Sequence, residues 1–290
     1  MRKRIFSFMI AGIISCGAIA QIEVSSVKES TSFTIADETT QATIVYDEAD
    51  APVVATVANC LAEDVALVTG KRLVVSGGLP ADNTSNLIIA GTIGQSPLID
   101  NLIAKGKVDI SQVSGKWEVY SLQKVDKNLI IIGSTPRGTA YGLFELSRQM
   151  GVSPYVWWAD VIPTKKKALY VNGNKMVSKE PSVKYRGIFI NDEDWGLQPW
   201  AAKGLDKQYN NIGPNTYARV MELLLRLRAN TLWPAMHLVQ RLSGQIRTTC
   251  QWRENMTLCS VPVTASRCCV IMSGNGVMLL GTEPTKIGTT

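Results

Sequence analysis

The chain has 290 residues, of which 46% are hydrophobic and 19% are charged, and this ordinary globular composition excludes a disordered protein. Three of the charges behind its formal net charge of +6 are Arg2, Lys3 and Arg4, and the later run 165–167 is typical of a solvated turn. A nucleic-acid-binding face would interleave basic and aromatic side chains, so no nucleic-acid partner is expected.

The first 20 residues have the pattern of a secretory signal peptide. Basic residues precede an apolar run over 5–14, and Ala18-Ile19-Ala20 offers an A-x-A cleavage site. The run is too short for a spanning helix, so no membrane span is expected. Cys16 ends a segment that resembles a lipoprotein box, which leaves lipid attachment as an alternative to cleavage after Ala20. In both cases we expect a secreted or periplasmic protein.

Residues 21–180 show the strand and helix patterns of one α/β domain. Apolar periodicity and turn residues predict strands over 42–46, 72–76, 86–90, 117–122 and 129–132, and helices over 50–69 and 136–150. We predict that Thr135 caps the second helix and that Gly151 ends it. Helices interleaved with strands, two of which form a hairpin, predict a covered mixed sheet. The turn 133–138 lacks the spacing of a phosphate-binding loop.

A second domain is predicted to begin near residue 181, after the crossing segment 156–167. The apolar run Tyr185–Ile190 is typical of a buried parallel strand. A helix is predicted over 217–228 and a further strand over 231–235. The apolar stripe of that helix consists of Val220, Leu223, Leu224 and Leu227. The order strand, loop, helix, strand opens either a β/α barrel or a doubly wound sheet.

Four polar residues and a tryptophan, Asn191-Asp192-Glu193-Asp194-Trp195, follow the first of these strands. Barrel enzymes carry catalytic residues at the carboxyl ends of strands. Neighbouring carboxylates raise one another's pKa, so one acid can stay protonated while another is ionised. The flat rings of Trp195 and Trp200 suit a sugar. An acidic turn with Trp195 packed in the core explains the same spacing equally well.

His237 is the single histidine and follows the second predicted strand. A single histidine is more often structural than catalytic, although its place at the end of a barrel strand favours a role in the site. One histidine without an ordered set of cysteines cannot build a closed metal site. We therefore expect neither a metal nor another cofactor.

Segments 181–196, 211–214 and 226–237 resemble glycoside hydrolase family 115, and the resemblance extends from about Gln21 to His237. It implies an α/β chain: a mixed-sheet accessory domain like that of β-hexosaminidases at 21–180, then the first βα units of an incomplete (β/α)8 barrel at 181–237. It also implies an enzyme that removes α-1,2-linked glucuronic or 4-O-methylglucuronic acid from xylan with inversion.

The resemblance places the acidic cluster in the active site, with Asp194 as the first catalytic candidate, Asp192 the second and Glu193 beside them. The residues that it implies for substrate binding are Asn191, Trp195 and His237. Inversion needs two carboxyl groups about 6.5–9.5 Å apart, and the partner carboxylates are expected on later strands. Glucuronoxylan or its oligosaccharides are the implied partners. The resemblance allows a dimer but does not fix the oligomeric state.

Residues 238–290 depart from this resemblance. They hold four of the six cysteines, which by themselves suggest a disulfide or metal patch. When residues 261–276 are back-translated into codons and the reading frame is moved one base earlier, the new codons encode the amino-acid sequence GSSHCEQMLRNNEWEW. Family members carry a block that reads roughly like this. We therefore predict a wrong-frame, disordered tail, and a genuine divergent tail is the alternative.

A barrel closes with eight strands, and this chain supplies about two of them. We therefore expect an inactive fragment of a xylan α-glucuronidase. One alternative is a non-catalytic module, either carbohydrate-binding or inert. A different barrel glycosidase, such as a relative of hexosaminidases, is a third interpretation, against which the segment 233–237 argues.

Overall fold

The computed structural model describes residues 21–81, 86–190 and 195–233, together with short strands at 259–260, 270–273 and 276–279. The predicted signal peptide, including Cys16, lies outside the described residues. So do five of the predicted site residues: Asn191, Asp192, Glu193, Asp194 and His237.

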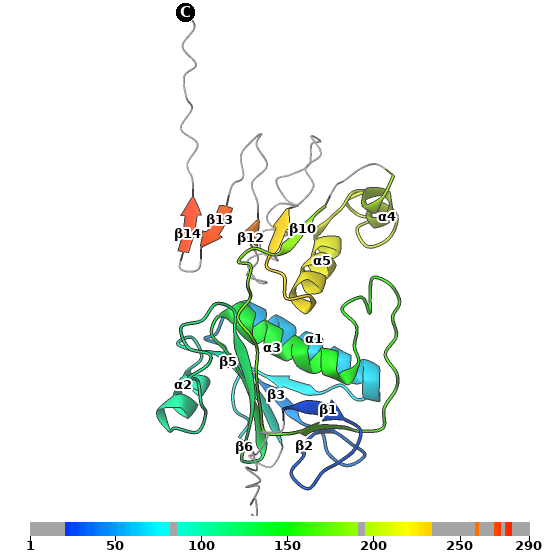
Figure 1. Ribbon diagram of the computed structural model, residues 1–290. Helices are drawn as coiled ribbons and strands as arrows, with labels where there is room; N and C mark the ends of the chain where they lie inside the picture. Colours follow the sequence, from blue (N-terminus) through cyan, green and yellow to red (C-terminus); the bar gives the residue numbers. More distant parts are fainter. Residues whose placement is uncertain are drawn as a thin grey trace, which may run out of the picture.

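A six-stranded sheet in the order β4-β3-β5-β7-β6-β9 forms the centre of the N-terminal domain (Figure 1). Its strands are β3 (Thr43–Val45), β4 (Val74–Ser76), β5 (Leu87–Thr92), β6 (Tyr120–Val125), β7 (Asn128–Gly133) and β9 (Lys175–Val177). The four strands β4, β3, β5 and β7 are parallel, and β6 runs antiparallel to both β7 and β9. A second, antiparallel sheet consists of β1 (Glu23–Ser25), β8 (Leu169–Asn172) and β2 (Phe33–Ala36). The predicted mixed α/β sheet is therefore confirmed.

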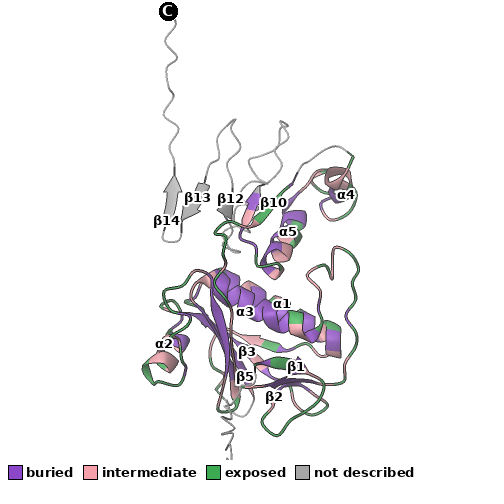
Figure 2. Ribbon diagram, in the orientation of Figure 1, coloured by how far each residue is buried: buried purple, intermediate pink, exposed green. Residues whose placement is uncertain are grey.

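Helices cover both faces of the main sheet because its strands are apolar on both sides. Ile88 and Ile131 belong to one core cluster with α1 (Pro52–Thr69) and α3 (Pro136–Met150). Their neighbours Ile89 and Ile130 belong to a second cluster with α2 (Pro97–Ala104), since successive residues of a strand point to opposite faces. Figure 2 shows the nearly continuous buried surface of α3.

The predicted cap Thr135 and the predicted end at Gly151 are both confirmed for α3. The Thr135 side chain accepts a hydrogen bond from the Gly138 N–H at 3.1 Å, and Gly151 ends the helix with a φ of 98°, a conformation that favours glycine. The hairpin of β6 and β7 is also confirmed. In α1, Leu67 is 41% exposed, so it lies outside the buried side of the helix.

Among the residues that the structure describes, α1 is the one helix long and apolar enough to pass a test for a membrane span. Its residues Val53, Val57 and Leu61 are fully buried in the domain core. The buried carboxylate of Asp64 on the same helix pairs with Arg226. Packing within the domain therefore accounts for the apolar character of α1.

The second unit is a βαβ arrangement that stands on the α1–α3 face of the first (Figure 1). Its elements are β10 (Gly187–Phe189), α4 (Leu197–Lys203), α5 (Pro214–Arg226) and β11 (Thr231–Trp233). β10 pairs parallel with β11, and β11 pairs parallel with β12 (Cys259–Ser260). A separate antiparallel hairpin consists of β13 (Val270–Ser273) and β14 (Gly276–Leu279). A strand, two helices and a parallel strand agree with the start of a β/α fold.

Two predictions about burial in this unit are wrong. Tyr185, Ile188 and Phe189 are 59%, 41% and 58% exposed, although Ile190 is buried as predicted. A parallel strand is buried throughout only when both faces of its sheet are covered. Leu227 ends α5 and is 43% exposed, so it does not belong to the buried stripe.

The tail predicted to be disordered contains the three short strands β12, β13 and β14. Its other residues lie outside the described part of the chain. The prediction that 238–290 is translated in the wrong frame is not tested by these strands and stays a prediction.

Candidate active site at the carboxyl ends of β10 and β11

The parallel pairing of β10 and β11 brings the starts of both predicted site segments to one edge. Phe189 lies opposite Trp233 in the register, so the acidic segment 191–194 and the segment that leads to His237 leave the sheet at the same end. In β/α barrels this end carries the catalytic residues. The positions of the acids and of His237 beyond this edge remain predictions.

Trp195 is the one predicted site residue within the described part of the chain, and it is 83% exposed. The alternative in which Trp195 packs in the core is therefore wrong. Trp200, on α4, is 44% exposed. Two indole rings are thus open to solvent in the segment that follows the acids.

Asp206 fixes the long loop between α4 and α5. Its carboxylate is fully buried and accepts hydrogen bonds from the N–H groups of Gly213 at 3.1 Å and Thr216 at 2.9 Å, and from the Thr216 hydroxyl at 2.6 Å. These donors belong to the first turn of α5, whose N–H groups have no partner within the helix. α5 begins three residues before the predicted helix 217–228, and Asp206 has no local signal in the sequence because it lies eight residues before the helix, outside the usual N-cap position.

A buried glutamate of the first domain holds the bases of both β10 and β11. The Glu118 side chain, fully buried, accepts hydrogen bonds from Arg137 at 2.5 Å, from Asn230 at 3.0 Å and from the Arg186 guanidinium. Arg186 precedes β10 and Asn230 precedes β11, and the Arg186 N–H donates to the Asn230 side chain at 3.0 Å. Glu118 has a φ of 52°, a left-handed backbone that non-glycine residues adopt at an energetic cost.

A second buried glutamate ties the end of α5 to α3. The Glu145 carboxylate accepts hydrogen bonds from Arg148 at 2.6 Å, Gln149 at 2.9 Å and Arg228 at 2.7 Å. Arg228 also donates to the Tyr120 hydroxyl. The two domains therefore share a second ionic contact near the base of β11.

The third contact between the domains is a bidentate ion pair. The Arg226 guanidinium donates to both Asp64 oxygens, at 2.7 and 2.9 Å, and to Glu222 at 2.8 Å. The side chains of Arg226 and Asp64 are only 6% and 2% exposed. Planar guanidinium and carboxylate groups fit each other in this geometry, which fixes the orientation of α5 on α1.

A cleft of about 410 Å³ lies at this joint, and its walls include Tyr120, Val183, Arg186 and Arg228. It sits at the bases of β10 and β11, at the opposite end from the candidate active site. Since barrel enzymes react at the carboxyl end of their strands, we assign the cleft to the joint between the domains.

Acid is expected to weaken the Glu145 contact. Burial raises the pKa of this carboxyl, but hydrogen bonds from Arg148 and Gln149 outweigh burial and hold its pKa below the usual 4.5. A lowered pKa in the folded state contributes stability above pH 4.5, and this contribution is lost as the pH falls through the folded pKa. Urea unfolding of the wild type and Glu145→Gln should therefore give free energies that differ at neutral pH and converge in acid. A constant difference at all pH values would contradict this assignment.

Comparison with known proteins identifies the family. A model described as Glycosyl hydrolase family 115 matches residues 178–267. The fold is similar to a solved family GH115 4-O-methyl-α-glucuronidase, BtGH115A, with specificity for decorated arabinogalactans. The two share 39% identity at a TM-score of 0.64, over 76% of this chain and 28% of that enzyme. The chain belongs to glycoside hydrolase family 115.

This family 115 chain therefore spans less than a third of the enzyme it matches. The family match continues past His237 to residue 267, so the expected end of the resemblance at His237 is too early. None of the curated protein sequences compared with the chain matches it.

Other solved structures are similar at lower TM-scores. The chitobiase of Flavobacterium johnsoniae shares 15% identity at a TM-score of 0.47, over 82% of this chain and 33% of that enzyme. A mutant β-hexosaminidase of Streptomyces plicatus in complex with product shares 14% identity at the same TM-score, over 84% of this chain and 44% of that enzyme.

Proposed function

We propose that the intact gene product is a secreted glycoside hydrolase that removes α-1,2-linked glucuronic or 4-O-methylglucuronic acid from a decorated polysaccharide. The observation that carries this proposal is the 39% identity to a 4-O-methyl-α-glucuronidase over most of the chain. Glucuronoxylan and uronate-decorated arabinogalactan are the two candidate substrates. The signal sequence at 1–20 supports secretion.

We propose that the acids after β10 take part in an inverting reaction. One carboxyl group protonates the oxygen of the departing polysaccharide, while a second, ionised group removes a proton from the attacking water. Asp194 is the first candidate for one of these roles and Asp192 the second, with Glu193 beside them. Asn191, Trp195 and His237 are proposed to bind the uronic acid. The shared edge of β10 and β11 supports a site to which both segments contribute.

The 290-residue chain by itself is proposed to be inactive. Its second unit has β10, β11 and β12 in one sheet among the described elements, whereas a closed barrel has eight strands. The exposed Phe189 on the edge strand supports a sheet that lacks its usual cover. The predicted change of frame after His237 would remove the later strands and the carboxylates that they carry.

A non-catalytic carbohydrate-binding module is the second candidate function. It is favoured by the exposed rings of Trp195 and Trp200, which can contact sugars without any catalytic carboxylate. Binding without hydrolysis by the frame-restored chain would distinguish this function from the enzymatic one.

Two polypeptides test the proposed function: the 290-residue chain and a chain in which the frame is restored after the His237 codon. Each is incubated with glucuronoxylan and with uronate-decorated arabinogalactan, and released uronic acid is measured by chromatography. We expect release by the restored chain alone, with the β-anomer seen first by ¹H NMR because inversion acts on an α-linkage. Release by the 290-residue chain would refute its inactivity, and no release by an ordered restored chain would refute the reaction.

A further inference from the structure

Three tryptophans from both domains form a cluster beside α4. Trp157 and Trp158 belong to the segment between α3 and β8, and Trp200 belongs to α4. The Trp157 ring lies edge-on to Trp158 at 5.0 Å between centroids and to Trp200 at 5.8 Å. The rings of Trp158 and Trp200 are 5.8 Å apart and tilted by 32°. We call these residues the tryptophan cluster.

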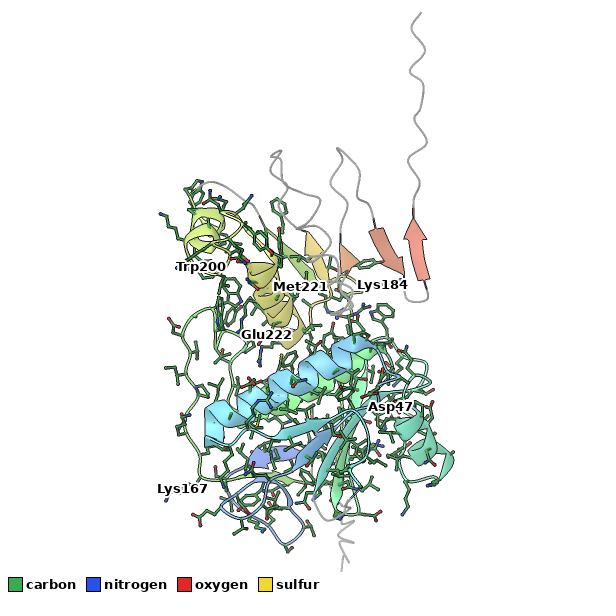
Figure 3. The ribbon with its side chains drawn as sticks, turned by 180° about the vertical axis from the view of Figure 1, so that it is seen from behind. Asp47, Lys167, Lys184, Trp200, Met221 and Glu222 are labelled. Atoms are coloured by element: carbon green, nitrogen blue, oxygen red, sulfur yellow. The ribbon has the colours of Figure 1, made fainter. Side chains whose placement is uncertain are left out.

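The two tryptophans of the first domain contact Arg219 on α5 of the second unit. The Trp158 indole N–H donates to the Arg219 carbonyl oxygen at 3.2 Å, and the Arg219 guanidinium lies over the Trp157 ring at 5.2 Å. Arg219 also pairs with Glu222 at 2.8 Å. Figure 3 labels Trp200 on α4 and Glu222 on α5, both in the second unit. These contacts fix Trp157 and Trp158 and so form a rigid support behind Trp200.

Trp200 is still 44% exposed despite this support. Indole is the largest apolar side chain, and structures usually bury most of it. Arg219, whose guanidinium lies over the Trp157 ring, is paired with Glu222, and this pair is neutral overall. The surface therefore suits an uncharged, flat-faced ligand better than a carboxylate.

We propose that Trp200 is a stacking surface for the neutral main-chain sugars of the polysaccharide, and that Trp157 and Trp158 position it. This inference rests on the proposed function. Because that reaction removes a charged branch, the main chain from which the branch departs must lie beside the acids. Trp200 follows those acids in the loop and helix after β10. The C–H faces of a sugar ring pack on an aromatic ring, and the accessory domain thereby helps to orient the substrate.

The test is binding of unbranched, uronate-free oligosaccharides to the 290-residue chain. The probes are xylohexaose and a β-linked galactohexaose, measured by saturation-transfer NMR and titration calorimetry. The wild type should bind at least one of them, and Trp200→Leu, which keeps an apolar side chain but loses the flat ring, should bind about tenfold or more weakly, equal to about 1.4 kcal/mol. Trp200→Phe should recover much of the binding.

Tyr155→Ala is the matched control, because Tyr155 is an aromatic residue of the segment that carries Trp157 and Trp158 and is 46% exposed. It should bind like the wild type. Equal binding by wild type and Trp200→Leu would overturn the proposal and leave the cluster a packing contact, as would failure of the wild type to bind either probe. Since the probes carry no uronic acid and no bond is cleaved, these results are independent of the hydrolysis that tests the proposed function.

Discussion

Glu118→Ala is expected to lower the free energy of unfolding by about 3–5 kcal/mol, the usual cost of removing one partner from a buried ionic network. The substitution leaves Arg137, Arg186 and Asn230 without the carboxylate that they share. Since Arg186 and Asn230 precede β10 and β11, the second unit should detach before the first unfolds. Urea unfolding monitored by tryptophan fluorescence gives the free energy, and hydrogen exchange of the β10 and β11 amides shows which unit opens.

Two variants serve as controls for this result. Glu118→Gln retains the size and one acceptor oxygen and should be less destabilising than the alanine. Glu63→Ala removes the partner of Arg72 from a pair whose side chains are 61% and 49% exposed, and it should cost less than about 1 kcal/mol. A loss for Glu118→Ala as small as that for Glu63→Ala would show that the network does not hold the domains together.

Gly187→Ala is expected to disturb the edge from which the acidic segment starts. A Cβ at this position would overlap the carbonyl oxygen of Thr231 on β11, and backbone cannot move aside as a flexible side chain can. Overpacking of this kind costs about 1–3 kcal/mol. Hydrogen exchange should show lower protection of the β10 and β11 amides, while the N-terminal sheet keeps its protection.

Gly78→Ala is the control substitution, since a Cβ added at Gly78, in the first domain, would meet no atom within 4 Å. It should leave protection and stability almost unchanged. If Gly187→Ala proved as mild as this control, the close pairing of β10 with β11 would be incorrect.

Short-range features of the fold were predictable from sequence. The cap residue Thr135 and the terminating Gly151 both act on neighbours within a turn of α3, so the residues that specify the helix ends are adjacent to it. The apolar runs of β5 and β7, which turn residues bound, predicted strands in the same way. Elements with few periodic residues, such as α2 and β9, gave no comparable signal and were missed.

The contacts that join the two domains were not predictable. Glu118 lies 68 residues from Arg186 and 112 from Asn230, and no local pattern distinguishes it from a surface glutamate. Burial of β10 was predicted because its run of apolar residues is typical of a covered strand, whereas its exposure depends on which strands lie beside it. Trp157 and Trp158 lie in the predicted crossing segment 156–167, but their contact with Trp200 depends on the docking of α5.

The central claim is that the acids after β10 carry the catalysis of a family 115 enzyme. The most direct measurement is the rate of uronic acid release from glucuronoxylan by the frame-restored chain and its Asp194→Asn variant. Loss of a general acid or base lowers rates by about 10²–10⁴-fold, and we expect Asp194→Asn to fall by that factor with unchanged thermal stability. A variant as fast as the unsubstituted restored chain would contradict the assignment of catalysis to this edge of the sheet.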